Sequence, residues 1–256
     1  MNPSIRFSRL VRKALRFRGE FEAAKRQLGT NGFQWYPYDS FSNVFQIQEL
    51  MNRADLSLDR IAGGDRVLDI GAADGALSLF FESVGYTVDS WDCSSTNMNR
   101  MQGIRALAQA FGSKIEISDI DLDARFEMNR EYSLVLFLGT LYHLKNPFYA
   151  LETLARHARF CFLSTRVARL NADRTVRIDA MPIAYLLDAD ECNSDTTNYW
   201  IFSPPGLMRL AGRAGWDVRV SATCGPPESD PTSAAGDERM FLLLESKHWS
   251  GSDSNT

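Results

Sequence analysis

The run from Asp65 to Leu77 constrains the fold more than any other stretch of the chain, because its pattern changes at Gly71. Residues 66–70 are aliphatic or β-branched in large part, which is typical of a strand buried on both faces of a parallel sheet. After the turn, apolar side chains recur at helical spacing until Gly85. The sequence therefore predicts a strand that leads through a glycine turn into a helix, whose first backbone amides face a ligand.

Two carboxylates in this turn distinguish between the ligands of such folds. A dinucleotide-binding turn has the pattern Gly-x-Gly-x-x-Gly without nearby acids, because its ligand carries a negative pyrophosphate. Here Asp69 lies two residues before Gly71, and Asp74 lies inside the turn. Negative charge at this place would repel a diphosphate and attract S-adenosylmethionine (SAM), whose ammonium and sulfonium groups are positive. The alternative is an ordinary turn that uses its glycines for geometry alone.

The same residues resemble a known motif. Asp69, Gly71, Ala73 and Gly75 are similar to motif I of class I SAM-dependent methyltransferases, acidic-x-Gly-x-Gly-x-Gly, with one glycine replaced by alanine. The resemblance implies SAM as the cofactor. It also implies an α/β, Rossmann-like class I methyltransferase fold, with a mostly parallel seven-stranded sheet, an antiparallel last strand and a helical N-terminal cap.

The ends of the next two predicted strands offer groups for a nucleoside. The second strand ends in Asp92, some twenty residues past the glycine turn, where a carboxylate can accept hydrogen bonds from a ribose diol. NAD and SAM both contain that ribose. The third strand, residues 114–118, is followed by Ile120 and Asp121, which would meet the face and the polar edge of adenine. The acidic stretch 119–123 is equally consistent with a solvated loop.

The clearest buried strand, residues 132–138, leads into Gly139-Thr140-Leu141-Tyr142-His143-Leu144-Lys145-Asn146-Pro147. This segment is similar to the Gly-x-Leu-Tyr-His-x-x-x-Pro motif of the wobble-uridine tRNA carboxymethyltransferase family, which uses carboxy-SAM, and of its uncharacterised methyltransferase relatives. Residues 198–204 are similar to that family's Asn-x-Tyr-Phe-x-Pro segment, and the resemblance covers roughly residues 64–220. It implies a cofactor pocket lined by Asp92, Cys93, Ile120, Asp121, Leu138 and Tyr142.

Thr197 departs from that family, whose members have an arginine just before the asparagine that helps to hold the extra carboxylate of carboxy-SAM. An uncharged threonine cannot pair with a carboxylate as a guanidinium does, so methyl transfer is expected rather than carboxymethyl transfer. An oxygen acceptor also needs a base, and His143 beside Tyr142 is the candidate because imidazole takes a proton near neutrality. Tyr142 and His143 are thus the predicted catalytic residues. The alternative for His143 is a structural histidine with one hydrogen bond.

The N-terminal region is predicted to be helical and basic. The apolar stripe of residues 5–28 would pack on the domain with the charges solvated, or the helix would contact a membrane surface or RNA phosphates. The aromatic run 33–39 follows, and we expect a structural role for Trp35 and a site role for Tyr36 or Tyr38. The basic residues of the helix are Arg6, Arg9, Arg12, Lys13, Arg16, Arg18, Lys25 and Arg26.

Composition narrows the remaining choices. The net charge of −4 argues against nucleic-acid binding through a general basic field. The cysteines are widely spaced without a Cys-x-x-Cys pair, no metal-ligand cluster is visible and no apolar stretch reaches transmembrane length, so a cytoplasmic protein with reduced thiols is expected. The predicted organisation is a cap over 1–54, a SAM-binding domain over 55–245 with a lid insertion at about 167–198, and a disordered tail over 246–256. The oligomeric state stays open.

Taken together, the sequence predicts a SAM-dependent methyltransferase that transfers a methyl group to an oxygen or nitrogen of a small-molecule or glycan acceptor. One alternative is a tRNA-modifying alkyltransferase that uses SAM or carboxy-SAM and binds RNA through the basic helix. The other is a non-catalytic nucleotide-binding scaffold.

Overall fold

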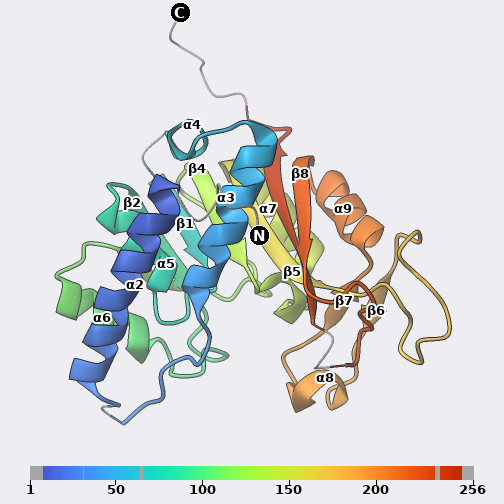
Figure 1. Cartoon of the computed structure of the whole chain (residues 1–256), viewed down its shortest axis with the longest axis horizontal. Helices are drawn as coiled ribbons and strands as arrows, with labels where there is room; N and C mark the ends of the chain where they lie inside the picture. Colours follow the sequence, from blue (N-terminus) through green and yellow to red (C-terminus); the bar gives the residue numbers. More distant parts are fainter. Residues whose placement is uncertain (1–7, 31, 64–65, 234–236, 250–256) are drawn as a thin grey trace, which may run out of the picture.

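A mixed β-sheet runs through the middle of the computed structural model, which describes residues 8–30, 32–63, 66–233 and 237–249 (Figure 1). The main strand order is β3-β2-β1-β4-β5, followed by β9 and then β8. All of these strands are parallel except β9, which is antiparallel to both of its neighbours. The strands are β1 (Arg66–Ile70), β2 (Thr87–Asp92), β3 (Glu116–Asp119), β4 (Tyr132–Leu138), β5 (Ala158–Val167), β6 (Ala184–Leu186), β7 (Trp200–Phe202), β8 (Trp216–Cys224) and β9 (Glu238–Ser246).

The sheet has nine strands rather than the predicted seven. The reason lies in the length of β5, which continues past its last pairing with β4, at Ser164, as far as Val167. This leaves backbone groups of β5 free on the side of β4, and an unpaired strand edge accepts another strand. There β7 pairs in parallel with β5 through Val167 and Phe202, and β6 pairs with β7. Both extra strands thus belong to the segment between β5 and α9.

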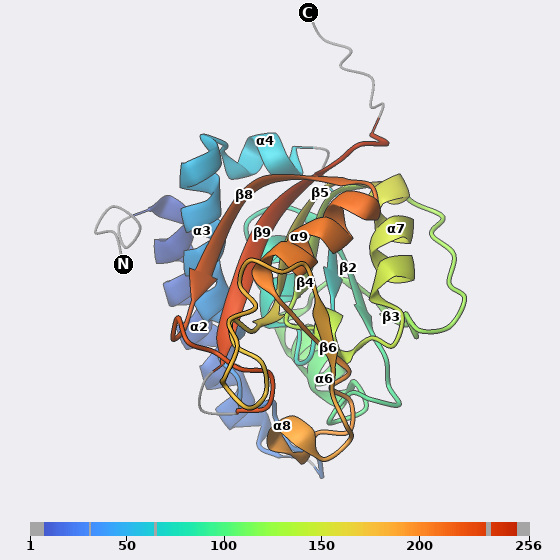
Figure 2. The same ribbon diagram turned by 90° about the vertical axis from the view of Figure 1, so that its right-hand side faces the viewer.

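Helices cover both faces of the sheet, with α2 and α3 on one side and α7 and α9 on the other (Figure 2). Four of the helical segments in the described part of the chain, η1, α4, η2 and α8, have five residues or fewer. The helices are α2 (Arg9–Leu28), η1 (Ser40–Ser42), α3 (Asn43–Ala54), α4 (Leu58–Ala62), α5 (Ala76–Ser83), α6 (Gln102–Phe111), η2 (Leu141–His143), α7 (Pro147–His157), α8 (Glu191–Ser194) and α9 (Pro204–Arg213). No helix in the described part of the chain is long and apolar enough to cross a membrane.

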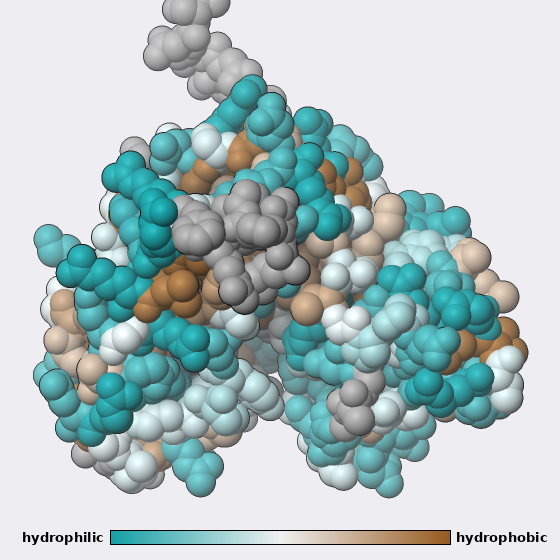
Figure 3. Space-filling model, viewed as in Figure 1, coloured by the Kyte–Doolittle hydropathy of each residue, from teal (hydrophilic) through white to brown (hydrophobic). Residues whose placement is uncertain are grey.

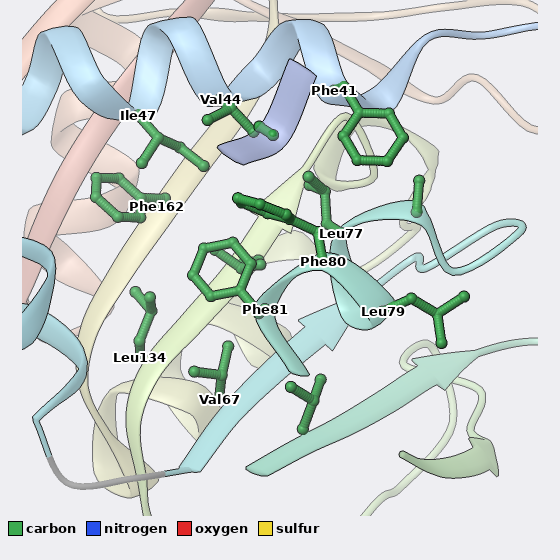
Figure 4. Packing of buried hydrophobic residues seen from close by; sticks show 14 of the residues in the cluster. Phe41, Val44, Ile47, Val67, Leu77, Leu79, Phe80, Phe81, Leu134 and Phe162 are labelled. Carbon is green, nitrogen blue, oxygen red and sulfur yellow. The ribbon is translucent and has the colours of Figure 1, made fainter. Parts of the chain in front are cut away.

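Strand residues alternate between two hydrophobic cores because successive side chains of a strand point to opposite faces. Val67 and Leu134 join the core formed with α2, α3, α5 and α6, whereas Leu68 and Val135 join the core formed with α7 and α9. Figure 4 shows Phe80 of α5 in the first core, below the residues of α3. Both faces of the central strands are therefore buried, as predicted for a parallel sheet.

The basic helix packs its apolar stripe into the first core. Val11, Ala14, Phe17 and Phe21 of α2 are buried, and its lysines and arginines lie mostly toward solvent. The Ser8 side chain caps the helix by accepting a hydrogen bond from the Val11 amide at 3.1 Å. The predicted residues 5–7 of this helix, and residues 250–256 of the predicted tail, lie outside the described residues.

One helix begins later than the sequence predicts. In the sequence, apolar residues recur at helical spacing from Met98 to Phe111, which predicts a helix from about Thr96, but α6 begins at Gln102. The Asn97 side chain accepts hydrogen bonds from the amides of Asn99 and Met101, and the latter residue has a left-handed backbone. Such local bonds compete with the helical ladder, so residues 96–101 form turns instead.

Candidate functional site

The ends of four parallel strands meet at one edge of the sheet. Ile70 of β1 is in register with Trp91 of β2 and Phe137 of β4, and Asp92 is in register with Asp119 of β3. The turns that follow these strands therefore lie side by side. In open α/β sheets this carboxyl edge is where ligands bind. Figure 3 shows a hollow at the lower edge of the molecule, between the part that carries α6 and the lobe that carries α8.

The glycine turn after β1 has the left-handed backbone that its sequence requires. Gly71, Ala73 and Gly75 have φ angles of 69°, 53° and 81°. A side chain at Gly71 would clash, because an added Cβ would lie 2.1 Å from the Thr140 hydroxyl. Ala73 keeps the positive φ that favours glycine, at a cost of roughly 1 kcal/mol. The positive φ angles therefore define the shape of the turn, and Thr140 leaves no room for a side chain at Gly71.

Asp92 joins the turns after β1, β2 and β3. Its carboxylate accepts hydrogen bonds from the backbone amides of Ala73 and Cys93, each at 2.8 Å, and its carbonyl accepts one from the Ile120 amide at 2.8 Å. Burial raises the pKa of Asp92, and the two amides oppose that shift. The side chain is half-buried. A carboxylate has about four acceptor positions, so Asp92 keeps acceptor capacity for a ligand.

Asp69 is buried beneath the turn. Its carboxylate accepts a hydrogen bond from the Ser78 hydroxyl at 2.6 Å, and the side chain is 4% exposed. Burial raises the pKa of Asp69 to about 6, the Ser78 hydrogen bond opposes this, and the charge of Asp92 adds to it. The carboxylate is therefore still largely ionised at pH 7, and a positive charge nearby would favour its charged form further.

Asp74 serves a different purpose from the one that its place in the turn suggests. Its carboxylate forms an ion pair with Lys25 of α2 at 2.8 Å, and it accepts hydrogen bonds from the Tyr36 amide at 2.8 Å and the Asn99 side chain at 2.7 Å. Lys25 neutralises this charge. The expected negative field of the turn therefore rests on Asp69 and Asp92, and Asp74 anchors the N-terminal segment.

The aromatic segment lies across the turns after β1 and β2. Tyr36 connects them, because its amide bonds Asp74 and its hydroxyl accepts a hydrogen bond from the Met98 amide at 2.9 Å. Burial raises the pKa of Tyr36 to about 12, so the hydroxyl stays protonated. The Trp35 indole donates to the Gly29 carbonyl at 2.8 Å, and Tyr38 is 77% exposed. A groove of about 520 Å³ lies between this segment and α2.

The other residues predicted to line a cofactor pocket differ in exposure. Ile120 and Leu138 are half-buried at the ends of β3 and β4. Cys93 is also half-buried, and its thiol lies 3.1 Å from the Ser95 hydroxyl. Asp121 is exposed, and its carboxylate accepts a hydrogen bond from the Asp123 amide at 2.9 Å. This places Asp121 in a solvated turn beside the edge.

Tyr142 lies in η2, just past the end of β4, under a guanidinium that sequence reasoning missed. Arg239 of β9 lies 5.7 Å from the centroid of the Tyr142 ring and pairs with Asp237 at 3.1 Å. The carbonyl of Tyr142 accepts a hydrogen bond from the Tyr199 amide at 2.9 Å, which attaches the insertion to η2. Burial raises the pKa of the Tyr142 hydroxyl, and the Arg239 charge opposes this.

The His143 ring lies beside the Tyr142 ring, with centroids 4.0 Å apart and planes tilted by 35°, and it contacts the end of the insertion. Its Nδ1 lies 2.9 Å from the Thr197 hydroxyl and 3.1 Å from the Thr197 carbonyl. Burial lowers the pKa of His143, and the nearby Asp195 carboxylate opposes this shift. The predicted catalytic pair is thus together at the strand edge, with a neutral imidazole at pH 7.

Comparisons with known proteins place the chain among relatives of the same fold. A family model described as a methyltransferase domain matches residues 19–220. The N-terminal domain of EvdMO1 with SAH bound is similar at a TM-score of 0.52 and 18% identity, over 90% of this chain and 96% of that one. A Bacillus halodurans C-125 protein classed as a methyltransferase gives 0.57 and 14%, over 77% and 96%. The [4+2]-cyclase SpnF gives 0.56 and 12%, over 84% and 87%. No curated protein matches the chain.

These structural likenesses show the fold alone, since sequence identity is low and one of the similar structures is a cyclase. The family model is more informative because it runs from α2 to β8 and includes every strand end described above.

Proposed function

Because the chain belongs to the methyltransferase-domain family, we propose that it transfers the methyl group of SAM to an oxygen or nitrogen of a small-molecule or glycan acceptor. When bound, SAM supplies a methyl group that is already activated by its sulfonium. The protein's own tasks are then to bind the nucleoside, align the acceptor and exclude water.

The observation that carries this proposal is the position of Asp92. Its carboxylate is fixed by the amides of Ala73 and Cys93 and retains acceptor capacity at the edge of the sheet. A ribose diol offers two donors to such a group. Ile120, whose amide bonds the Asp92 carbonyl, would cover the adenine ring. The residues present therefore fit a nucleoside.

Charge supports a cationic nucleoside over a dinucleotide. Asp69 and Asp92 are close enough for the charge of one to raise the pKa of the other. A diphosphate would add two further negative charges to this place, whereas the ammonium and sulfonium of SAM reduce the repulsion. Leu138 and Tyr142 would then lie beside the reacting methyl group, with His143 next to them.

Calorimetry tests the cofactor assignment. We expect Asp92→Ala to abolish measurable SAM affinity, because the ribose loses its fixed acceptor and the turn loses the bond to Ala73. Asp217→Ala is the matched control, since Asp217 is an exposed carboxylate on β8. Unchanged affinity in Asp92→Ala would remove the pocket assignment, and tight NAD binding by the wild type would overturn the choice of ligand.

Radiolabelled SAM incubated with separated small-molecule, glycan and RNA fractions tests the acceptor. Label in the first two fractions supports the proposal. Label in RNA would support the tRNA-modifying alternative. SAM binding without any transfer would support a non-catalytic scaffold.

The carboxy-SAM alternative has one observation in its favour. Arg239 places a guanidinium against the ring of Tyr142. The sequence predicted no positive charge here, because Thr197, which contacts the neighbouring His143, stands where the tRNA family has an arginine. Asp237 pairs with Arg239 and already uses part of that charge. Measured against the wild type, an Arg239→Gln variant that loses affinity for carboxy-SAM but keeps affinity for SAM would favour this alternative.

A further inference from the structure

A chain of three hydrogen-bonding groups connects the insertion to His143. The Thr197 hydroxyl lies 2.6 Å from Asp195 Oδ1, and the Thr197 amide donates to the same oxygen at 2.9 Å. The hydroxyl oxygen also lies 2.9 Å from His143 Nδ1, and the Thr197 carbonyl lies 3.1 Å from that nitrogen. His143, Asp195 and Thr197 are all half-buried residues.

These contacts determine which ring nitrogen carries the proton. A carbonyl oxygen only accepts, so its contact with Nδ1 requires a proton on Nδ1. The Thr197 hydroxyl has one proton, and the ionised Asp195 can only accept it. The hydroxyl oxygen is then left to accept from Nδ1 as well. Both contacts give the same tautomer, with an unprotonated Nε2.

We propose that Thr197 and Asp195 are positioning residues that hold the proton of His143 on Nδ1, so that Nε2 accepts the proton of a hydroxyl acceptor. This inference rests on the proposed methyl transfer and narrows its acceptor class. A hydroxyl is a weak nucleophile while it keeps its proton, whereas a neutral amine attacks with its own lone pair. A base with a fixed free nitrogen therefore serves oxygen acceptors best.

The methyl transfer and the proton transfer need no further reactant. As the acceptor oxygen bonds the methyl carbon, the carbon–sulfur bond breaks and its electron pair stays on sulfur. The hydroxyl proton moves to Nε2 of His143, and the imidazolium later releases a proton to solvent. The Asp195 carboxylate polarises the Thr197 hydroxyl, and the resulting negative potential at Nδ1 stabilises that imidazolium.

Charged groups face His143 from two other elements. Asp195 of the insertion raises the pKa of His143 and Arg239 of β9 lowers it, while burial has the largest effect and also lowers it. Burial would raise the pKa of Asp195, but the Thr197 hydrogen bonds outweigh this and hold it below its ordinary value. The carboxylate is therefore ionised at neutral pH.

Nitrogen-detected NMR of the ring tests the inference on the full chain without cofactor or acceptor. The chain has three histidines, and His143→Gln identifies the signals of interest. At pH 8 we expect the wild type to show a protonated Nδ1 and a free Nε2. Thr197→Ser should keep this tautomer, whereas Thr197→Val should lower its share. Thr196→Val is the matched control, because Thr196 is exposed.

The titration midpoint supplies the second readout. Asp195→Asn should shift the His143 midpoint to lower pH, because the variant loses the negative charge that favours the imidazolium. A wild type with its proton on Nε2 would overturn the inference, as would a Thr197→Val variant whose tautomer and midpoint match the wild type.

Transfer assays separate this inference from the proposed function. His143→Gln should lose about 100-fold in methylation of a hydroxyl acceptor and Thr197→Val about tenfold, with Thr197→Ser close to the wild type. Neither the His143→Gln variant nor the Thr197→Val variant should change the SAM affinity measured by calorimetry. An enzyme that binds SAM and methylates only amines, at the same rate in His143→Gln, would refute the base while leaving methyl transfer intact. Absent SAM binding would refute the proposed function and not the tautomer.

Discussion

At the scale of single residues, the candidate site contains one buried carboxylate, Asp69, and one half-buried carboxylate, Asp92. Asp69 is buried with one hydroxyl partner, Ser78, and its pKa is raised as a result. Asp92 is held by two backbone amides. The folded chain bears the desolvation cost of Asp69 whether or not a ligand is present. Such a group is expected to destabilise the free protein and to favour a cation when one binds.

The pH dependence of stability tests this cost. The pKa of Asp69 rises from 3.8 in a model compound to about 6 in the fold, so the folded state binds more protons than the unfolded state between these values. Stability therefore falls as pH rises through this window, by about 3 kcal/mol for this residue. Urea unfolding of Asp69→Asn should lack that decline and should give a more stable protein at pH 7. Identical pH profiles for the variant and the wild type would refute the raised pKa.

Some of these residues were predictable and others were not. Asp69, Gly71 and Asp92 follow from the sequence because the ends of parallel strands must meet at one edge. Arg239 and Tyr142 lie almost a hundred positions apart in the chain, and no spacing in the sequence predicts their contact. The same holds for His143 and Thr197, since neither the turn at Asp195 nor the ring orientation is encoded in a periodic pattern.

At the scale of elements, a buried ion pair attaches α2 to Asp74 of the glycine turn, and the Tyr36 amide attaches the aromatic segment to the same carboxylate. The Lys25 and Asp74 side chains are 10% and 3% exposed. Lys25 also lies over the rings of Phe21 and Trp35, at 5.0 Å and 5.4 Å from their centroids. The N-terminal segment thus stabilises the shape of the turn from outside.

Removing one partner of this pair should be costly. Lys25→Met leaves the buried Asp74 charge uncompensated, and we expect the free energy of unfolding to fall by about 3 kcal/mol. Arg26→Met, at the neighbouring exposed position, should change it by less than about 0.5 kcal/mol. The double variant Lys25→Met with Asp74→Asn should recover part of the loss. Equal stabilities of Lys25→Met and Arg26→Met in urea unfolding would contradict this role.

The positions of helices and strands agree with the prediction where burial determines the spacing of the apolar residues. The central strands and α5 fall where the apolar pattern predicts them. The late start of α6 and the extra strands β6 and β7 did not follow, because side-chain bonds of Asn97 and the free edge of β5 determine them. Such effects depend on tertiary neighbours or local capping that a hydrophobic pattern does not record.

At the scale of the whole molecule, the net charge of the chain and the charge of the exposed face of α2 have opposite signs. The chain has a net charge of −4, while the exposed face of α2 is basic. Counterion release makes RNA binding strongly dependent on salt, and a few exposed cations on an acidic protein give weak, unspecific binding. The charge distribution thus argues against tight binding of RNA.

Filter binding to tRNA across a salt series checks this point. We expect weak binding that does not differ between the wild type and a variant with Arg9, Lys13 and Arg16 changed to Gln. Tight binding with a steep salt dependence, lost in the variant, would support the tRNA-modifying alternative.

The most direct test of the account is a crystal structure of the chain with S-adenosylhomocysteine. We predict the ribose hydroxyls on the carboxylate of Asp92, adenine beside Ile120 and the sulfur facing Leu138 and Tyr142. A ligand bound elsewhere, or an Asp92 carboxylate without contact to the ribose, would contradict the central claim that this edge of the sheet binds a cationic nucleoside.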